Sequence, residues 1–338
     1  MKRDISICIV YNLKDPARQD DSQEEYDEIE TIEGLKREIE NNGLKVSLLE
    51  QDDHFLSKIQ QNRPDLVFNI AEGKGKTRSR ESQVPCMLES LGIPYFGSDP
   101  FSLGLTLDKY MTNVVLRSAG IPVPAVYMVD KHGGVDDLGN IFDEHERFIV
   151  KPRWEGSSKG IFSDSIVTGP GSLRKKTEYI LSNYSQPVII EEFIEKDEIT
   201  VGVLGNAEPQ VLCMMRISPL EVRQGHFVYS IENKRDWEKK IKYEPSGMID
   251  KSIRDKIEHF ASEAFRALEL RDLARIDFRV DHSGIPRIID VNPLPGLSPR
   301  YSDLMIMYRL AGGGYPDLIK KILAAFLTRC GFALPVHK

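Results

Sequence analysis

The sequence predicts a protein of mixed class, with an N-terminal α/β domain on a doubly wound parallel sheet and α+β structure after it. Two observations lead to this prediction. Strand and helix patterns alternate through the N-terminal part, as they do where helices join parallel strands. From residue 148 onward strand patterns follow one another closely, as they do in antiparallel sheets.

In the N-terminal part, short apolar runs predict buried strands at 5–13, 45–50 and 66–71. Amphipathic segments predict helices at 24–42, 54–63 and 82–91. Ligands of such a sheet bind beyond the carboxyl ends of the strands, here the loops after Tyr11 and Ala71. The second loop carries four cations, Lys74, Lys76, Arg78 and Arg80. It is either an ordinary solvated loop or a lid that faces an anionic ligand.

After residue 105 the patterns predict one helix at 106–118, another at 173–183, and strands at 148–152, 188–194, 199–205 and 209–218. A long helix at 249–268 precedes two strands, 274–280 and 285–291, which a turn at 282–284 joins into a hairpin. Helices at 302–311 and 316–329 follow. The last helix is core or a dimer face, because apolar residues recur at helical spacing at Leu318, Ile322, Ala325 and Phe326.

Composition excludes several classes of protein. With 41% apolar and 29% charged residues, the chain falls in the ordinary globular class. Its 45 basic and 52 acidic residues argue against a general nucleic-acid binder. The apolar run near the start is too short for a signal peptide or a membrane helix. The four cysteines lie far apart without a CxxC pair, which favours free thiols and a cytoplasmic location.

The acidic excess lies in one segment. Residues 14–40 hold 11 acidic and 4 basic side chains, a difference that equals the net charge of −7 of the whole chain. The segment is either a solvated helix face, or it selects an amine-bearing substrate through acids such as Asp15, Asp20 or Glu24.

Three oxygen-bearing side chains point to a metal site. Asp277 and Asp290 flank the short turn of the predicted hairpin, so their side chains can converge on one face. Asn292 is two residues beyond Asp290 and therefore lies on that same face. Two carboxylates and an amide oxygen form a hard donor set of the kind that suits Mg²⁺.

Two further segments suggest nucleotide binding. The segment KPRWEGSSKG (151–160) has glycines, serines and lysines whose backbone N–H groups, hydroxyls and charge can cradle phosphate, although an ordinary flexible loop has the same composition. In EEFIEKDE (191–198) the backbone could bind an adenine and Glu198 the ribose hydroxyls, although such a charge run is usually just solvated.

Taken in order, these motifs resemble the ATP-grasp superfamily, and within it the D-alanine–D-alanine ligase-like branch. The resemblance rests on LGIPYFGSDP (91–100), LTLDKY (105–110), VKPRWEGSSKG (150–160), EEFIEKDEITV (191–201), IENK (231–234), ARIDF (274–278) and DVNPLPG (290–296). It implies an ATP-grasp fold with domains at 1–105, 106–198 and 199–338, and ATP held between the central and C-terminal domains.

The resemblance also implies roles for single residues. For ATP, it assigns the phosphates to Lys109 and Lys151, the closing loop to Gly156, Ser157 and Ser158, adenine to Glu191, Glu192 and Ile194, and ribose to Glu198. For metal, it assigns two Mg²⁺ ions, with Mn²⁺ as a substitute, to Asp277, Asp290 and Asn292, with Asp290 where the family usually has Glu. For catalysis, it assigns oxyanion stabilisation to Arg275 and the backbone N–H of Gly296, and lid closure to the loops of Ser157 and Lys234.

The implied reaction joins a carboxylate to an amine. The carboxylate of an amino acid or small peptide attacks the γ-phosphate of ATP, which gives an acylphosphate and ADP, and an amine then displaces phosphate. Two magnesium ions and three lysines would offset the repulsion between the reacting anions. The expected partners are therefore ATP and small molecules, without nucleic acid or membrane, and dimers are common in this family.

Departures from the family pattern all lie on the substrate side. The loop at 12–21 lacks the Gly/Ser-rich motif with a glutamate that holds the first amine. Other family residues are replaced at the candidate substrate positions Glu72, Arg235 and Tyr301, and Arg300 is a further candidate. The basic loop at 74–80, with Arg153, Arg235 and Arg300, suggests the hypothesis of a substrate with an extra negative group, unless these cations serve ATP.

Three functions stay open from the sequence alone. The first is an ADP-forming ligase for another amino acid or a small peptide. The second is a true D-alanine–D-alanine ligase of cell-wall synthesis. The third is a nucleotide-binding sensor or scaffold without catalysis, which a broken metal set or a missing lysine would favour.

Overall fold

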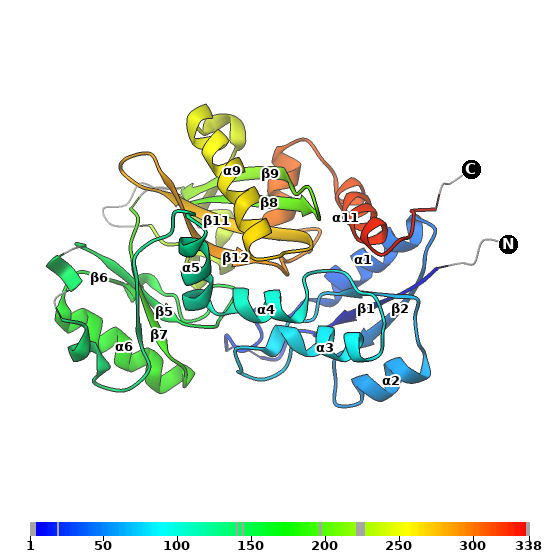
Figure 1. Ribbon diagram of the computed structural model, residues 1–338, viewed down its shortest axis with the longest axis horizontal. Helices are drawn as coiled ribbons and strands as arrows, with labels where there is room; N and C mark the ends of the chain where they lie inside the picture. Colours follow the sequence, from blue (N-terminus) through cyan, green and yellow to red (C-terminus); the bar gives the residue numbers. More distant parts are fainter. Residues whose placement is uncertain are drawn as a thin grey trace.

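The computed structural model describes residues 5–18, 20–139, 141–143, 145–195, 198–220 and 227–335. Its strands form three sheets that follow one another along the longest axis of the molecule (Figure 1). The N-terminal sheet lies at one end, beside both chain termini, and a four-stranded sheet lies at the other end. The five-stranded sheet between them is built from later parts of the chain.

The N-terminal sheet is parallel, as predicted, with the order β2-β1-β3. Its strands are β1 (Ser6–Tyr11), β2 (Lys45–Glu50) and β3 (Leu66–Asn69). Its helices are α1 (Ile29–Asn41), α2 (Phe55–Gln61) and α3 (Gln83–Ser90). Strand β3 is buried along its whole length, which is why it reads as a continuous apolar run rather than an alternating one.

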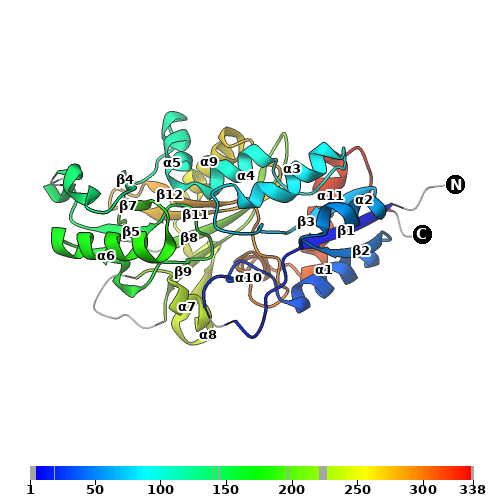
Figure 2. The ribbon, with the colours of Figure 1, turned by 90° about the horizontal axis from the view of Figure 1, so that it is seen from below.

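Helix α1 begins at Ile29, so the predicted start at residue 24 is wrong. The backbone before it is tied to the loop after β1, because Asp27 N donates to Asn12 O at 3.1 Å and Lys14 N donates to Asp27 O at 2.9 Å. These bonds hold residues 24–28 as a loop that runs toward α7 and α8, in dark blue in Figure 2.

The single helix predicted at 106–118 is two helices, α4 (Pro100–Leu107) and α5 (Lys109–Ser118). Asp108 separates them with an extended backbone, and its side chain caps α5 by accepting from Met111 N at 3.1 Å. Arg153 holds the same carboxylate with two hydrogen bonds of 2.8 and 2.7 Å. Asp108 is thus fixed from outside the helix, which places Lys109 at the first turn of α5.

The four-stranded sheet is antiparallel in the order β4-β7-β5-β6. Its strands are β4 (Val126–Val129), β5 (Phe148–Pro152), β6 (Ile166–Val167) and β7 (Val188–Glu192), and α6 (Pro170–Tyr184) packs on it. The sequence did not predict β4 or β6. Both are short edge strands, whose period-2 signal is too brief to distinguish from a loop.

The five-stranded sheet is antiparallel in the order β10-β9-β8-β11-β12. Its strands are β8 (Glu198–Gly205), β9 (Gln210–Pro219), β10 (Ile241–Pro245), β11 (Asp272–Val280) and β12 (Pro286–Asn292). The predicted hairpin is confirmed as β11 and β12, whereas the edge strand β10 was not predicted. Helices α9 (Lys251–Ala267) and α10 (Asp303–Leu310) pack on this sheet as parts of two different apolar clusters.

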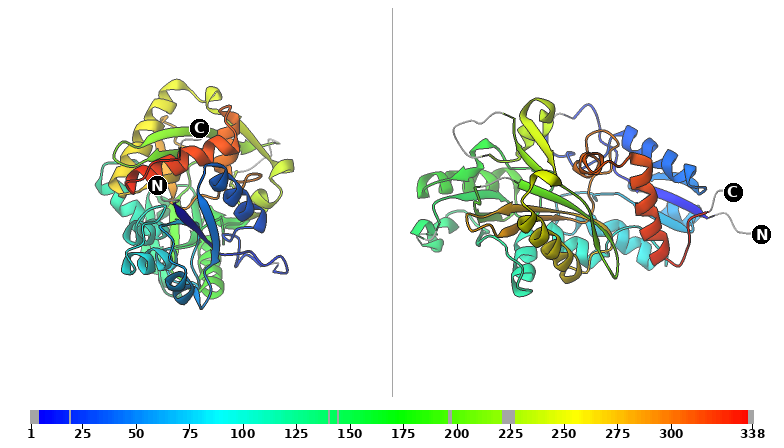
Figure 3. Two further views of the ribbon diagram at one scale, coloured as in Figure 1. Left: turned by 90° about the vertical axis from the view of Figure 1, so that its right-hand side faces the viewer. Right: turned by 90° about the horizontal axis from the view of Figure 1, so that it is seen from above.

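The remaining helices are α7 (Ile231–Arg235), α8 (Trp237–Lys240) and α11 (Tyr315–Arg329). Short 3-10 helices lie at η1 (Arg80–Ser82), η2 (Gly134–Leu138), η3 (Ile141–Asp143), η4 (Ser163–Ser165) and η5 (Ser246–Met248). Helix α11 packs beside α1 (Figure 3), and Leu318, Ile322 and Phe326 are fully buried within this chain. Of the two readings of this apolar stripe, core is therefore correct.

Among the described residues, no helix combines the length and apolar character needed to cross a bilayer. All four cysteines are free. The division into domains at 105/106 and 198/199 stays a prediction, and helix α11 shows how closely the parts interlock, since it shares one apolar cluster with the N-terminal sheet.

An ion pair with a fully buried carboxylate joins the N-terminal sheet to the five-stranded sheet. Asp272, at the start of β11, accepts from Arg329 Nε at 2.8 Å and from Gly97 N at 2.9 Å. Arg329 also donates to Tyr95 O at 2.7 Å, so β11, α11 and the segment between α3 and α4 meet at one carboxylate.

We expect Asp272→Ala to destabilise the fold by about 3 kcal/mol, because it leaves the Arg329 guanidinium without a counter-charge and the Gly97 N–H without an acceptor. Asp272 also has φ +63°, a left-handed conformation that alanine tolerates poorly and asparagine well. Asp272→Asn is therefore expected to lose less stability. Urea unfolding followed by circular dichroism measures both, and equal midpoints for Asp272→Ala and the natural protein would contradict this account.

Candidate functional site

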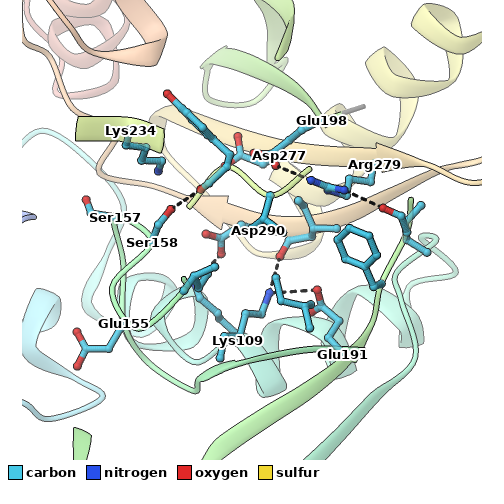
Figure 4. Close-up of a pocket in the computed structure, with 18 of the residues that line it drawn as sticks. Lys109, Glu155, Ser157, Ser158, Glu191, Glu198, Lys234, Asp277, Arg279 and Asp290 are labelled. Atoms are coloured by element: carbon cyan, nitrogen blue, oxygen red, sulfur yellow. Dashed lines mark hydrogen bonds and ion pairs between the residues drawn. The ribbon is translucent and has the colours of Figure 1, made fainter. Parts of the chain in front are cut away.

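Two adjoining cavities lie where the sheets meet. The inner cavity, of about 80 Å³, lies between the four-stranded and five-stranded sheets, and Figure 4 shows the side chains that line it. The outer cavity, of about 610 Å³, extends toward the loop after β1. Residues that line both cavities are Lys109, Ser157, Tyr229, Lys234 and Arg275.

One buried ion pair lies on the four-stranded sheet at the inner cavity. Lys151 of β5 places Nζ 3.1 Å from Glu191 Oε1 of the neighbouring β7, and both side chains are buried. Burial raises the pKa of Glu191, and Lys151 opposes that rise by stabilising the ionised carboxylate. Lys151 Nζ also donates to Ile289 O at 3.5 Å, so it reaches across to the five-stranded sheet.

A second ion pair joins α5 to β12. Lys109 Nζ lies 2.7 Å from Asp290 Oδ1. Burial alone would raise the pKa of Asp290, but Lys109 and Lys151 outweigh it and lower that pKa. Asp290 therefore remains an anion inside the cavity.

The hairpin of β11 and β12 brings Asp277, Asp290 and Asn292 together on one face. Asp277 is the direct cross-strand partner of Asp290, and Asn292 Nδ2 donates to Asp277 Oδ2 at 3.2 Å. Carboxylates opposite each other repel. A different cation offsets each charge, because Arg275 binds Asp277 while Lys109 binds Asp290.

This donor set fits a hard divalent cation. Mg²⁺ in nucleotide sites is usually held by one or two carboxylates together with phosphates and water. Within the described ranges, no group of three or more His, Cys, Asp or Glu side chains is arranged to hold a metal. A cation held by Asp277, Asp290 and Asn292 would take its remaining oxygen ligands from water or from a phosphate-bearing ligand.

Arg275 lies where the two cavities meet. Its Nε and Nη2 donate to the two oxygens of Asp277 at 3.0 and 2.9 Å, and Nη1 lies 3.3 Å from Asp303 Oδ2. Burial opposes the charged form, yet the two carboxylates raise the pKa of Arg275, so its guanidinium stays charged.

The residues predicted for adenine and ribose all line the inner cavity, namely Glu191, Glu192, Ile194 and Glu198. Glu198 begins β8, and burial raises its pKa to about 7 against the effect of Arg279, which lies 3.5 Å away. Arg279 Nη1 donates to Ile194 O at 2.9 Å. Glu192 also lines this cavity, although its carboxylate accepts from Ala125 N at 3.0 Å outside it.

The glycine-rich loop and the segment leading into α7 are in contact. Ser157 and Ser158 both have left-handed backbones, with φ +48° and +60°. Ser158 Oγ donates to Tyr229 O at 3.0 Å, which joins the two predicted lids. Lys234 Nζ lies 4.8 Å from the centre of the Tyr229 ring, a cation–π distance. Figure 4 shows Ser157, Ser158 and Lys234 on the same side of the cavity.

Glu25 is a site residue that the sequence did not single out. Its carboxylate accepts from Gly156 N at 2.7 Å and lies 2.6 Å from Arg80 Nη2 and 2.9 Å from Lys159 Nζ. A Cβ at residue 156 would clash with this carboxylate, which explains the glycine there. The loop before α1 thus holds the glycine-rich loop. The contacts of Glu25 join residues far apart in the sequence, and no motif marks them. The one sequence feature that included Glu25 was the acidic excess of residues 14–40.

The predicted substrate residues Glu72, Arg235, Arg300 and Tyr301, together with Gly296, all line the outer cavity. Arg235 pairs with Glu24, and Arg300 pairs with the exposed Glu30 at 3.2 Å. Ser302, also missed, lines this cavity one position after Tyr301 and caps α10 by accepting from Met305 N at 3.4 Å.

With the exception of Lys76, the cations behind the hypothesis of a negatively charged substrate have acidic partners within the chain. Arg153 and Arg78 both face Asp108, and Lys74 faces Asp53. Arg80 faces Glu25, as Arg235 and Arg300 face Glu24 and Glu30. This pairing removes the main support for an anionic group on the substrate.

Comparison with known proteins assigns the family. Residues 115–324 match the model for the D-ala D-ala ligase C-terminus. The chain belongs to the D-alanine–D-alanine ligase family. An uncharacterised protein, y4sG, of Sinorhizobium fredii is 33% identical over 83% of this chain and 82% of its own length. A D-alanine–D-alanine ligase of Moorella thermoacetica is 30% identical over 83% of this chain and 88% of its own.

Solved structures share the fold. A D-alanine–D-alanine ligase of Bacillus anthracis, complexed with ATP, superposes with a TM-score of 0.72 at 22% identity, over 96% of this chain and 98% of the other. VanG D-Ala:D-Ser ligase of Enterococcus faecalis gives a TM-score of 0.73 at 19% identity, over 96% and 100%. The predicted ATP-grasp fold and the predicted family of ATP-dependent, ADP-forming ligases are confirmed.

We expect Glu25→Gln to loosen the glycine-rich loop, because the amide leaves Glu155 as the one carboxylate that Arg80 and Lys159 share. Backbone hydrogen exchange at 154–160 should become roughly tenfold faster or more. Glu24→Gln is the matched control, since Glu24 pairs with Arg235 instead. Unchanged exchange in Glu25→Gln would show that the loop is held by other contacts.

Proposed function

We propose that the protein is an ATP-dependent, ADP-forming ligase that joins the carboxylate of an amino acid or small peptide to an amine through an acylphosphate. The observation that supports this most directly is the arrangement of Lys109, Lys151, Asp277 and Asp290 around one cavity between two sheets. Cations and carboxylates placed in this way suit a nucleotide phosphate with its metal.

For ATP, the proposal gives the phosphates to Lys109 and Lys151 and to the backbone of Gly156, Ser157 and Ser158. Glu191, Glu192 and Ile194 would surround adenine, and Glu198 would accept from the ribose hydroxyls. Two Mg²⁺ ions, or Mn²⁺, would be held by Asp277, Asp290 and Asn292. When bound, the metal withdraws charge from the phosphates and so makes attack by an anion less unfavourable.

For catalysis, we propose that side chains and backbone groups of the protein stabilise the developing negative charge and exclude water. Arg275, charged and at the junction of the cavities, would stabilise the oxyanion of the amide-forming step together with the Gly296 N–H, each typically worth about 3–4 kcal/mol. The contact between Ser158 and Tyr229 would keep both lids closed, which protects an acylphosphate from water.

The substrate is proposed at the level of class. The outer cavity would hold the amino acid, with Glu72, Arg235, Arg300 and Tyr301 as contacts. D-alanine is one candidate, because relatives are D-alanine–D-alanine ligases. Another amino acid or a peptide is favoured by the size of the cavity and by its charged walls. A cytoplasmic location and a homodimer also stay predictions, the first supported by four free thiols.

The decisive experiment is a coupled ADP-release screen over pairs of D- and L-amino acids, with mass spectrometry of the product. ADP that forms only with a particular acceptor pair, together with the matching amide, supports the ligase. Tryptophan fluorescence at Trp154 and Trp237 that responds to ATP, without turnover across the panel, would instead favour a sensor or scaffold.

We expect Asp290→Asn to lower kcat roughly 100-fold or more and to raise the Mg²⁺ concentration needed for tight ATP binding. The amide removes one of the two facing carboxylates and leaves Lys109 unpaired. Asp255→Asn, on the exposed face of α9 beside Lys251, is the control. If Asp290→Asn released ADP like the natural protein, the metal assignment would fail.

We expect Lys234→Ala to weaken ATP binding and turnover by roughly tenfold to 100-fold, because a charge-assisted contact to phosphate is lost. Lys234 has no carboxylate partner among the described residues and faces the Tyr229 ring. Lys240→Ala, in the same lid but paired with Asp236, should leave both constants nearly unchanged. Equal effects of the two substitutions would argue for a general loss of lid structure.

A further inference from the structure

One buried carboxylate differs from all the others. Nine Asp and Glu residues are buried in the described part of the chain, and only Glu81, at 7% exposure, has no cation within 4 Å there. The other eight each face Arg or Lys, namely Glu38, Asp108, Glu155, Glu191, Glu198, Glu244, Asp272 and Asp277.

Glu81 lines the outer cavity, and among the other acids that line it Asp27 and Glu72 resemble it most. Both are half-buried, and neither side chain has a hydrogen bond or ion pair among the described residues. The two cations whose charge is felt at Glu81 are engaged elsewhere, Arg80 with Glu25 and Lys109 with Asp290. The wall of the cavity formed by the N-terminal part therefore carries Asp27, Glu72 and Glu81 as buried or half-buried carboxyl groups without a counterion among the described residues, besides the exposed Glu28.

The backbone brings these three groups together from separate segments. Gly73, with φ +85°, packs so closely on the carbonyl of Arg80 that a Cβ would clash, which sets Glu72 against Glu81. Gly73 O also accepts from Tyr26 Oη at 3.1 Å, and this bond fixes the segment that ends in Asp27. The convergence is thus built into the loops after β1 and β3, where ligands of a parallel sheet bind.

Keeping three carboxyl groups in one cavity is unfavourable without a ligand. Burial raises the pKa of Asp27 to about 7 and that of Glu81 to about 8, and it raises the pKa of Glu72 well above its usual range. Mutual repulsion adds to burial at Glu72, because Glu81, Glu25 and Asp27 all act on it. A cation among these groups would relieve both effects.

We propose that the outer cavity binds a substrate with a cationic group beyond those that form the new bond, held by Asp27, Glu72 and Glu81. The substrate class is a diamino acid, or a peptide with such a residue. An amino acid that contributes its carboxylate brings one ammonium group, which can face only part of this set. A side-chain ammonium supplies the second cation. This inference rests on the proposed ligase function, which places the amino acid in the outer cavity and ATP in the inner one.

The test compares ligands that differ only in the side-chain cation. Isothermal titration of the full chain with Mg²⁺ and a non-hydrolysable ATP analogue measures the affinity for lysine against norleucine and for ornithine against norvaline, in both D and L forms. We expect at least one cationic member to bind roughly tenfold more tightly than its neutral partner, as charge-assisted contacts predict. ADP release is measured with the same ligands.

Two variants test whether the preference for a cationic ligand depends on Glu72 and Glu81. Glu81→Gln and Glu72→Gln should each reduce it roughly tenfold while raising the thermal midpoint of the ligand-free protein, because an unpaired buried acid is removed. Glu244→Gln is the matched control, a buried carboxylate outside both cavities that pairs with Arg216. It should keep the preference and lower the thermal midpoint.

The outcomes separate the two proposals. Equal affinity within every pair, undetectable binding included, overturns the cationic substrate, as does a preference that survives in both glutamine variants. Turnover of neutral amino acids with equal affinities would leave the ligase standing and remove only this inference. A cationic preference without ADP release from any acceptor pair would support the cation site and contradict the ligase.

Discussion

The site depends on one constraint, which is that charge buried between two sheets must be compensated across the gap between them. Lys109 on α5 meets Asp290 on β12, and Lys151 on β5 reaches Glu191 and the carbonyl of Ile289. The Lys109–Asp290 pair and the bond from Lys151 to Ile289 O join different parts of the fold, so these two contacts also fix how the parts face each other. The groups suited to bind phosphate are therefore the groups that hold the cavity together before any ligand enters.

The same constraint extends to the N-terminal part through two carboxylates. Asp272 binds Arg329 and Gly97 on the outer side, and Glu25 binds Arg80, Lys159 and Gly156 at the cavity. Asp272 is fully buried and holds α11 against β11. The second reaches the loop proposed to close on ATP, so the segment that would contact the amino acid also sets the position of that loop. In the proposed mechanism Glu25 would therefore link the segment near the amino acid to the loop near the nucleotide.

Local pattern predicted much of this arrangement but not its long-range contacts. The period of two along strands was enough to place Asp277, Asp290 and Asn292 on one face, and apolar runs located β1, β3, β8 and β11. The start of α1 could not be predicted, because Glu25 and Asp27 are held out of the helix by partners far away in sequence. Asp108 likewise breaks a helical pattern because Arg153 binds it from the turn after β5. Short edge strands such as β4 and β10 carry too few residues for a period to register.

The carboxyl groups that have no counterion within the chain are the groups proposed to determine substrate specificity. On the nucleotide side each buried carboxylate has a partner within the chain, so that side can stay formed whatever amino acid is present. On the substrate side Glu81 has none, and Asp27 and Glu72 share its cavity. A wall of this kind costs stability in the free protein, and such a cost persists where a ligand repays it on binding. Two of the departures from the family motifs, at Glu72 and in the loop after β1, fall on this same wall, which is where a change of substrate would require new chemistry. The acidic excess of residues 14–40 is therefore divided by the fold: Glu24 and Glu25 are bound to cations, and Asp27 faces the cavity with its charge free for a ligand.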